Sequence, residues 1–274
     1  MLKKSKTLFL LSILSSINIC LLTSCNIFDY HPYDVKIYGD TGLTAKNTAK
    51  IEDSLKGKKT FRFAMISDTQ RWYDETEDAV ESINARGDID FVIHGGDQVD
   101  FGLTKEYLWM RDILKLFDMP WVTVLGNHDC IGTGNDCYKK IYGDYNYTFT
   151  AGNVRFIFLN TNALEFDYGT AVPDFSFLKK QLNNYPAEAC RTIFVIHAPP
   201  FDVEFNNNVN YVFEDYLLKF PNPMFVLYGH VHQFKAGELF DDGLMYYACT
   251  KIKDRAYYVF TINENGYDYE IVNY

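Results

Sequence analysis

The sequence predicts an α/β protein built on two mixed β-sheets with helices packed against them. The first observation is an alternation of strand and helix patterns that begins near residue 61. Short apolar runs typical of buried strands occupy residues 61–67, 91–95 and 121–125, and helical patterns occupy 74–85 and 104–117. This alternation is typical of the α/β class.

The second observation is a change of pattern in the C-terminal half. A hairpin is expected from 147–150 and 153–160, followed by a helix at 175–182 and strands at 192–196 and 224–228. After these the pattern is mostly strand, at 233–239, 244–248, 256–262 and 267–272, with turns at 241–243 and 263–266. Late strands without intervening helices predict two mixed sheets rather than one parallel sheet.

The first 24 residues have the pattern of a targeting segment. Lys3, Lys4 and Lys6 precede an apolar run at 8–22, which ends in the small residues before Cys25. This resembles a bacterial lipoprotein signal, in which Cys25 becomes the lipid-carrying N-terminus. An ordinary secretory signal and a signal anchor are the alternatives, although the run is short for a spanning helix. We expect a protein anchored by lipid to a membrane of the cell envelope, outside the cytoplasm.

The rest of the chain divides into a tether and one domain. Residues 25–58 are polar and aperiodic and are expected to form the tether, whereas 59–274 are long enough for one domain with a substantial core. The full chain has a formal net charge of −10 at pH 7. An acidic chain without basic clusters is unsuited to duplex nucleic acid, whose binding requires neutralisation of phosphates.

Four cysteines follow Cys25 in the sequence. In an oxidising compartment Cys130 and Cys137 are the expected disulfide pair, because only a short loop separates them. Free buried thiols are an equal alternative for Cys190 and Cys249. No paired C-x-x-C spacing is present, which argues against a structural zinc site.

Polar residues with metal-ligand chemistry follow five of the predicted strands. In an α/β sheet, ligands bind in the crevice beyond the carboxyl ends of the strands, so these five segments are expected to converge. Mixed nitrogen and oxygen ligands suit manganese, iron or zinc. The segments are 68–70 (Asp-Thr-Gln), 96–100 (Gly-Asp-Gln-Val-Asp), 126–129 (Gly-Asn-His-Asp), His197, and 229–232 (Gly-His-Val-His).

In this order the five segments resemble the blocks of the calcineurin-like metallophosphoesterase superfamily, over residues 61 to 262. The resemblance implies a four-layer α/β/β/α sandwich and two divalent or mixed-valence metal ions. It assigns Asp68, Gln70, Asp97 and His232 to one metal, and Asp97, Asn127, His197 and His230 to the other. Gln70 departs from the pattern, since the family usually has histidine there. Some family members that resemble this pattern carry glutamine there, and they include enzymes that hydrolyse nucleotide pyrophosphate bonds.

The resemblance also assigns catalytic roles next to the metals. His128 would protonate the leaving oxygen, with Asp129 orienting its ring, while hydroxide generated between the two metals attacks phosphorus. Asp100 is expected either to support the site or to cap the loop. His94 and His31 are expected to be structural, and Trp72, Tyr73, Phe201 and Tyr211 are candidates for lining the substrate cleft.

The sequence therefore predicts a metal-dependent hydrolase of phosphomonoesters or phosphodiesters. A nucleotide pyrophosphatase is the alternative within enzymes, and a surface-tethered binding protein with reduced catalysis is the alternative outside them. His128 argues against the latter, because a purely structural metal centre needs the ligands but not the acid. The sequence carries no signal for an oligomer interface.

Overall fold

The computed structural model describes residues 31–166 and 169–274, so the expected leader and Cys25 lie outside the described residues. One compact unit spans Val35–Tyr274, and residues 31–34 belong to a separate N-terminal unit. None of the helices in the described ranges has both the length and the apolar character needed to cross a membrane.

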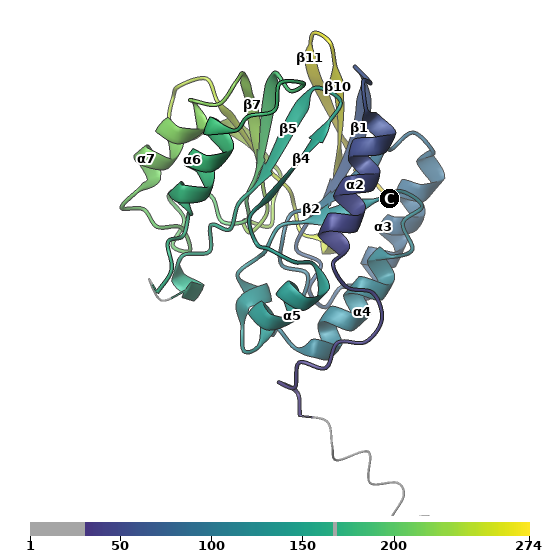
Figure 1. Cartoon of the computed structure of the whole chain (residues 1–274). Helices are drawn as coiled ribbons and strands as arrows, with labels where there is room; N and C mark the ends of the chain where they lie inside the picture. Colours follow the sequence, from purple (N-terminus) through teal and green to yellow (C-terminus); the bar gives the residue numbers. More distant parts are fainter. Residues whose placement is uncertain (1–30, 167–168) are drawn as a thin grey trace, which may run out of the picture. The chain divides into compact units, whose positions relative to one another are not determined.

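Within this unit, two β-sheets are combined with six α-helices (Figure 1). The helices are α2 (Leu43–Leu55), α3 (Tyr73–Arg86), α4 (Thr104–Leu114), α5 (Gly134–Ile141), α6 (Phe175–Asn183) and α7 (Asn210–Leu217). Short 3₁₀ turns occupy His128–Cys130, Leu164–Phe166 and Ile252–Asp254.

Both sheets are mixed, as the sequence predicts. The first has five strands in the order β11-β10-β1-β2-β3, and the second has six in the order β4-β5-β6-β7-β9-β8. Strands β1, β2 and β3 are parallel to one another, as are β5, β6, β7 and β9. The antiparallel pairs are β1 with β10, β10 with β11, β4 with β5, and β8 with β9. The strands are β1 (Phe61–Ile66), β2 (Phe91–His94), β3 (Trp121–Thr123), β4 (Tyr147–Ala151), β5 (Val154–Phe158), β6 (Arg191–Val195), β7 (Pro223–Tyr228), β8 (Lys235–Glu238), β9 (Met245–Ala248), β10 (Ala256–Asn263) and β11 (Gly266–Asn273).

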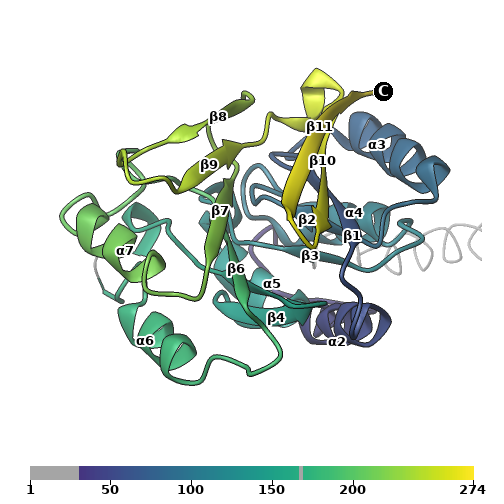
Figure 2. The same ribbon diagram turned by 90° about the horizontal axis from the view of Figure 1, so that it is seen from above.

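The side chains of the central strands alternate between two hydrophobic cores, which gives four layers. In β1, Phe63 and Met65 enter a central core between the sheets, which is rich in phenylalanine, whereas Ala64 and Ile66 face α3 and α4. In the second sheet, Phe194 and Val226 face α6 and α7 in a third core. Figure 2 shows α3 and α4 on the outer side of the first sheet and α6 and α7 on the outer side of the second. The expected α/β/β/α arrangement is confirmed.

Helix α2 corrects the expectation of an aperiodic tether over residues 25–58. It packs against β3 and β4, and its residues Ile51 and Leu55 are buried in the central core. The Asn47 amide donates to the Trp121 carbonyl at 2.7 Å, and Glu52 accepts from the Thr150 N–H at 2.9 Å. One helix thus contacts an edge strand of each sheet, and the compact unit begins well before residue 59.

Two further helices, α5 and α7, are not among the elements that the sequence predicts. The other predicted helices agree with the structure to within a few residues, and α3 ends where Gly87 adopts a left-handed conformation. The parallel strands β1, β2, β3, β6 and β7 all end at the same side of the molecule, where the polar segments begin. This side holds the candidate site.

Candidate metal centre

Close backbone approach brings the five segments together at the strand ends. The Asp68 N–H donates to the Gly96 carbonyl at 3.0 Å, and the Gln70 N–H donates to the Asp97 carbonyl at 3.1 Å. A Cβ at Gly126 would overlap Asp97, and a Cβ at Gly229 would overlap the Ser67 hydroxyl. These two glycines therefore permit a packing of loops that no other residue would allow.

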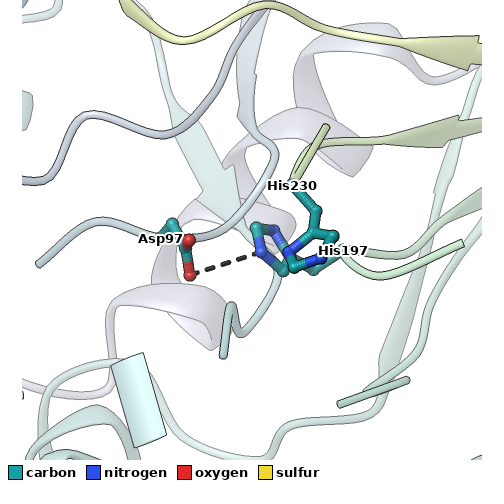
Figure 3. Close-up of side chains that lie close together, drawn as sticks. All are labelled: Asp97, His197 and His230. Atoms are coloured by element: carbon teal, nitrogen blue, oxygen red, sulfur yellow. Dashed lines mark ion pairs between the residues drawn. The ribbon is translucent and has the colours of Figure 1, made fainter. Parts of the chain in front are cut away.

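Two groups of side chains in the described residues have the geometry of metal sites, and Asp97 belongs to both. One group is Asp97, His197 and His230, and the other is Asp68, Asp97 and His232; within each group the ligand atoms lie within 4.8 Å of one another. Figure 3 shows the first group, with the side chains pointing toward one another from separate loops. Each group contains three of the four residues that the resemblance assigns to one metal.

Asn127 completes the first group. Its Oδ1 lies 3.0 Å from His197 Nε2 and 3.0 Å from His230 Nδ1, so one amide oxygen faces the same space as two imidazole nitrogens. The other nitrogen of His197, Nδ1, lies 2.8 Å from the Gly95 carbonyl, which fixes Nδ1 as the protonated nitrogen. His197 Nε2, the nitrogen that a metal could bind once its proton is displaced, faces Asn127 and Asp97.

Gln70 lies at the second group, where the family pattern has histidine. Its side chain is almost fully buried, and its amide nitrogen is 3.4 Å from Asp97 Oδ2. His232 Nε2 lies 3.1 Å from Asp68 Oδ1 and its side chain is 40% exposed. The second group is therefore more open to solvent than the first, in which His197 is fully buried.

The backbone is in the left-handed region at five of these residues. Positive φ values are rare for residues other than glycine and cost free energy, so they persist only where the surrounding structure enforces them. The residues are Asp68 (φ 53°), Gln70 (38°), Asp97 (56°), His230 (68°) and His232 (56°). Such concentration of strain at the converging side chains indicates a functional site.

The local charges favour a bound cation. Burial lowers the pKa of His197, but the adjacent carboxylate of Asp97 outweighs it and raises that pKa to about 10. Burial raises the pKa of Asp97, but the charge of His197 brings it below the ordinary value. The buried carboxylates thus create a negative potential where the imidazole lone pairs meet. A donor set of carboxylate, amide and imidazole fits manganese, iron or zinc.

His128 lies beside the two groups without belonging to either. Its backbone N–H donates to Asp97 Oδ1 at 2.9 Å, and its ring Nδ1 lies 2.8 Å from the Asp100 carbonyl oxygen. The side chain is 36% exposed. Since a carbonyl can only accept, Nδ1 carries a proton and Nε2 is the nitrogen able to exchange a proton with a substrate.

Comparison with known proteins agrees with this geometry. The model of the calcineurin-like phosphoesterase family matches residues 61–234, which is more than half of the chain. The chain belongs to this family. The matched region contains all seven candidate metal ligands and His128.

Two curated relatives of this phosphoesterase family are similar in sequence. One is a probable glycerophosphodiester phosphodiesterase of Arcobacter nitrofigilis, 27% identical over 168 residues that cover 55% of this chain and 59% of the relative. The other is a 3′,5′-cyclic-nucleotide phosphodiesterase of Nostoc, 25% identical over 158 residues that cover 54% and 58%. The chain therefore spans about three fifths of the length of these relatives.

A dimetal phosphatase from Danio rerio is a similar solved structure. The TM-score is 0.62 with 14% identity, and the match covers 79% of this chain and all of the other (100%). At this level of identity the likeness supports the phosphoesterase fold alone.

Asp129 of this phosphoesterase does not orient the His128 ring, which corrects the expectation. It is fully buried, and its two oxygens accept four backbone N–H groups, those of Asp97, Gln98, Val99 and Gly126, at 2.9 to 3.1 Å. Burial raises the pKa of Asp129 to about 7. Its role is to join the loop after β2 to the loop after β3, and the Asp100 carbonyl holds the His128 ring instead.

The disulfide expected between Cys130 and Cys137 is absent, and both residues are free and buried. The Cys130 thiol donates to the Gly126 carbonyl at 3.3 Å, whereas the Cys137 sulfur lies 3.4 Å from the Thr104 hydroxyl. A 3₁₀ turn and helix α5 contain the two cysteines and direct their sulfurs to different partners. Packing, rather than a covalent bond, holds this loop.

Sequence reasoning missed Asp202, which contacts the site. Its Oδ1 lies 3.0 Å from His230 Nε2, on the side of the ring opposite Asn127. The local signal is weak, since Asp202 is a single carboxylate five residues after His197. By contrast, His94 is structural as expected: it is buried, burial lowers its pKa to about 3, and it bonds to the Thr69 hydroxyl at 2.9 Å.

Proposed function

We propose that this chain hydrolyses phosphoric esters with two metal ions. The observation that carries the proposal is that Asp97 belongs to both groups of converging ligands. A carboxylate has two oxygens and can serve two cations at once. Asp68, Gln70, Asp97 and His232 would hold one ion, and Asp97, Asn127, His197 and His230 the other.

The ions would be divalent or of mixed valence, with manganese, iron and zinc as the candidates. Such a pair of ions supplies positive charge for the phosphoryl oxygens and makes water a better nucleophile at neutral pH. The protein contributes fixed positions, because strained loops and buried amide bonds hold each ligand before the substrate arrives.

His128 would donate a proton to the leaving oxygen. The Asp100 carbonyl accepts from Nδ1 and thereby fixes the ring orientation, which leaves Nε2 as the nitrogen that can transfer a proton. The carboxylate of Asp100 lies 3.9 Å from the same nitrogen and is paired with Arg71. These contacts hold the His128 ring in one orientation beside the two ligand groups.

The substrate class proposed is a phosphodiester or phosphomonoester. Both curated relatives are named as phosphodiesterases, which supports diesters, although this chain covers only part of their length. Nucleotide pyrophosphates are a second candidate, because Gln70 contacts Asp97 in the place where histidine is usual. A binding protein without catalysis is less well supported, since His128 keeps the geometry of an acid.

A substrate panel tests this function. The purified protein would be stripped of metal, reloaded with manganese, iron or zinc, and assayed on p-nitrophenyl phosphate, bis(p-nitrophenyl) phosphate and nucleotide pyrophosphates. The proposal predicts hydrolysis of at least one class that a chelator abolishes and added metal restores. If no class is hydrolysed with any of the three metals, the proposed function is wrong.

We also propose that Cys25 carries a lipid that holds the protein at an envelope membrane. The support is the sequence pattern alone, an apolar run that ends in Leu-Thr-Ser before Cys25. Each buried methylene contributes about 0.8 kcal/mol to membrane binding. Cys25→Ala should release the protein or block its processing in cell fractionation, and full membrane retention of a correctly cleaved variant would contradict the lipid anchor.

A further inference from the structure

Three aromatic side chains form an exposed cluster near the candidate metal centre. The ring centroids of Phe201, Tyr211 and Phe240 lie 5.0 to 6.2 Å apart in all three pairs. Phe201 is 51% exposed and Tyr211 is 68% exposed, whereas Phe240 also packs on the third hydrophobic core. Exposed aromatic rings gathered in one place indicate a binding surface rather than a packing surface.

The cluster is connected to the metal ligands through two short paths. Phe201 directly precedes Asp202, whose carboxylate bonds to His230 Nε2. Phe240 contacts Tyr246, which in turn contacts Tyr228, the last residue of β7 before Gly229 and His230. The first path reaches His230 by a direct contact, and the second reaches Tyr228, two residues before His230 in the sequence.

The loop holds Phe201 in an unfavourable backbone conformation. Its φ is 72°, in the left-handed region that a bulky residue rarely adopts. The Phe201 N–H donates to Asn207 Oδ1 at 2.7 Å, and the Asn207 amide donates to the Asp202 carbonyl at 2.7 Å. Asn207 therefore fixes Phe201 and Asp202 together, and such enforced strain is typical of residues that contact a ligand.

The charges around the cluster distinguish between possible occupants. Asp202 follows Phe201, Asp215 lies on α7 beyond Tyr211, and Asp241 and Asp242 follow Phe240. An anionic membrane surface attracts basic residues and is repelled by acidic ones. An uncharged planar ring is compatible with both the aromatic faces and the acidic border.

We propose that Phe201, Tyr211 and Phe240 bind the planar aromatic group of a phosphoester substrate, such as a nucleobase, while its phosphoryl group lies at the metal ligands. This inference rests on the proposed phosphoesterase function and specifies its substrate class. Stacking of a base on an aromatic side chain is worth about 1–3 kcal/mol, so loss of one ring should weaken binding roughly 5- to 150-fold.

Two hydrolysis-resistant phosphonates test the proposal, one isosteric with AMP and one isosteric with ribose 5-phosphate. The two ligands differ only in the base. Calorimetry on the manganese-loaded protein measures the affinity for each ligand without hydrolysis. The native protein should prefer the AMP analogue. Tyr211→Ala and Phe201→Ala should each remove most of this preference and leave the affinity for the ribose analogue unchanged. Tyr38→Ala, which removes another exposed aromatic residue, is the matched control and should keep the preference.

The proposal is overturned if the native protein shows no preference, or if both variants weaken the two ligands equally. It is also overturned if Tyr211→Ala instead reduces sedimentation with phosphatidylglycerol vesicles while the preference persists, because the cluster would then contact lipid. Hydrolysis of bis(p-nitrophenyl) phosphate is measured in parallel. Hydrolysis without base preference contradicts this inference alone, whereas base preference without hydrolysis of any substrate contradicts the proposed function alone.

Discussion

Asp202 Oδ1 lies 3.0 Å from His230 Nε2, while the other ring nitrogen of His230 lies 3.0 Å from Asn127 Oδ1. The carboxylate accepts the Nε2 proton and leaves the lone pair of Nδ1 directed toward the candidate metal centre. The hydrogen bond from His230 lowers the pKa of Asp202, which keeps this carboxyl ionised as an acceptor. Asp202 thus selects the tautomer of His230 that can bind a metal.

Replacement of Asp202 should therefore weaken metal binding without removing a ligand. Asp202→Asn is expected to lower metal affinity about 10- to 100-fold, as measured by competition with a fluorescent chelator. Asp215→Asn, an exposed acidic residue on α7, is the control. Equal metal affinity in the Asp202 variant and the native protein would contradict the proposal that Asp202 positions His230.

Replacement of His128 should reduce turnover without reducing metal binding. His128→Ala is expected to keep its metals, because the ring belongs to neither group of ligands, and to lose about 10²- to 10⁴-fold in turnover. The loss should be greatest with alkyl phosphates and smaller with p-nitrophenolate, which needs little protonation to leave. Metal content by mass spectrometry and kcat on the two substrate types are the measurements. A variant without metals, or with unchanged rates on every substrate, would contradict the assigned role.

Replacement of Asp129 should lower the stability of the folded protein. Asp129→Ala leaves four buried N–H groups without their acceptor, so the free energy of unfolding should fall by about 3 kcal/mol or more. His128→Ala, which removes a part-exposed ring, is the comparison and should cost less than about 1 kcal/mol. Urea unfolding of the metal-free protein measures the free energy of unfolding of both variants. Similar stability of the two variants would argue against a structural role for Asp129.

The sequence predicts which polar residues converge at the strand ends because most of them are marked locally. A polar residue of the right type directly follows a buried strand at Asp68, Asp97, Asn127, His197 and His230, and parallel strand ends converge in any α/β sheet. The structure brings all seven expected ligands together. The order of the five segments then specifies the family.

The features that the sequence did not predict depend on contacts between distant segments. Helix α2 buries only Leu43, Ile51 and Leu55 among its apolar residues, too few to show a helical pattern, and it is stabilised by β3 and β4. Asp129 resembles a catalytic acid in sequence, but its partners are amides of residues 97–99. The separation of Cys130 from Cys137 follows from the direction of α5, which the spacing does not reveal.

The stability of the protein should depend on pH through Glu214. This residue is almost fully buried on α7, where it accepts a hydrogen bond from Tyr246, and burial raises its pKa from 4.5 to about 7. Between these values the folded state binds more protons than the unfolded state, so the free energy of unfolding should decrease as pH rises through this window, by about 3 kcal/mol in total. Asp242 and Asp215, which lie nearby, act in the same direction.

Glu214→Gln should remove this contribution. The variant is expected to lose less stability between pH 5 and pH 8 than the native protein, as measured by urea unfolding of the metal-free form. Glu188→Gln, which changes an exposed acid, should behave as the native protein does. Parallel pH profiles for the Glu214 variant and the native protein would contradict the assignment.

The most direct test of a two-metal centre is the number of ions bound per chain and its dependence on Asp97. Elemental mass spectrometry of protein reloaded with manganese and freed of excess metal should give two ions per chain, and anomalous scattering from crystals should place both beside Asp97. Asp97→Ala should reduce occupancy of both positions, because its carboxylate belongs to both ligand groups. One ion per chain in the native protein, or two fully occupied positions in the Asp97 variant, would contradict the two-metal account.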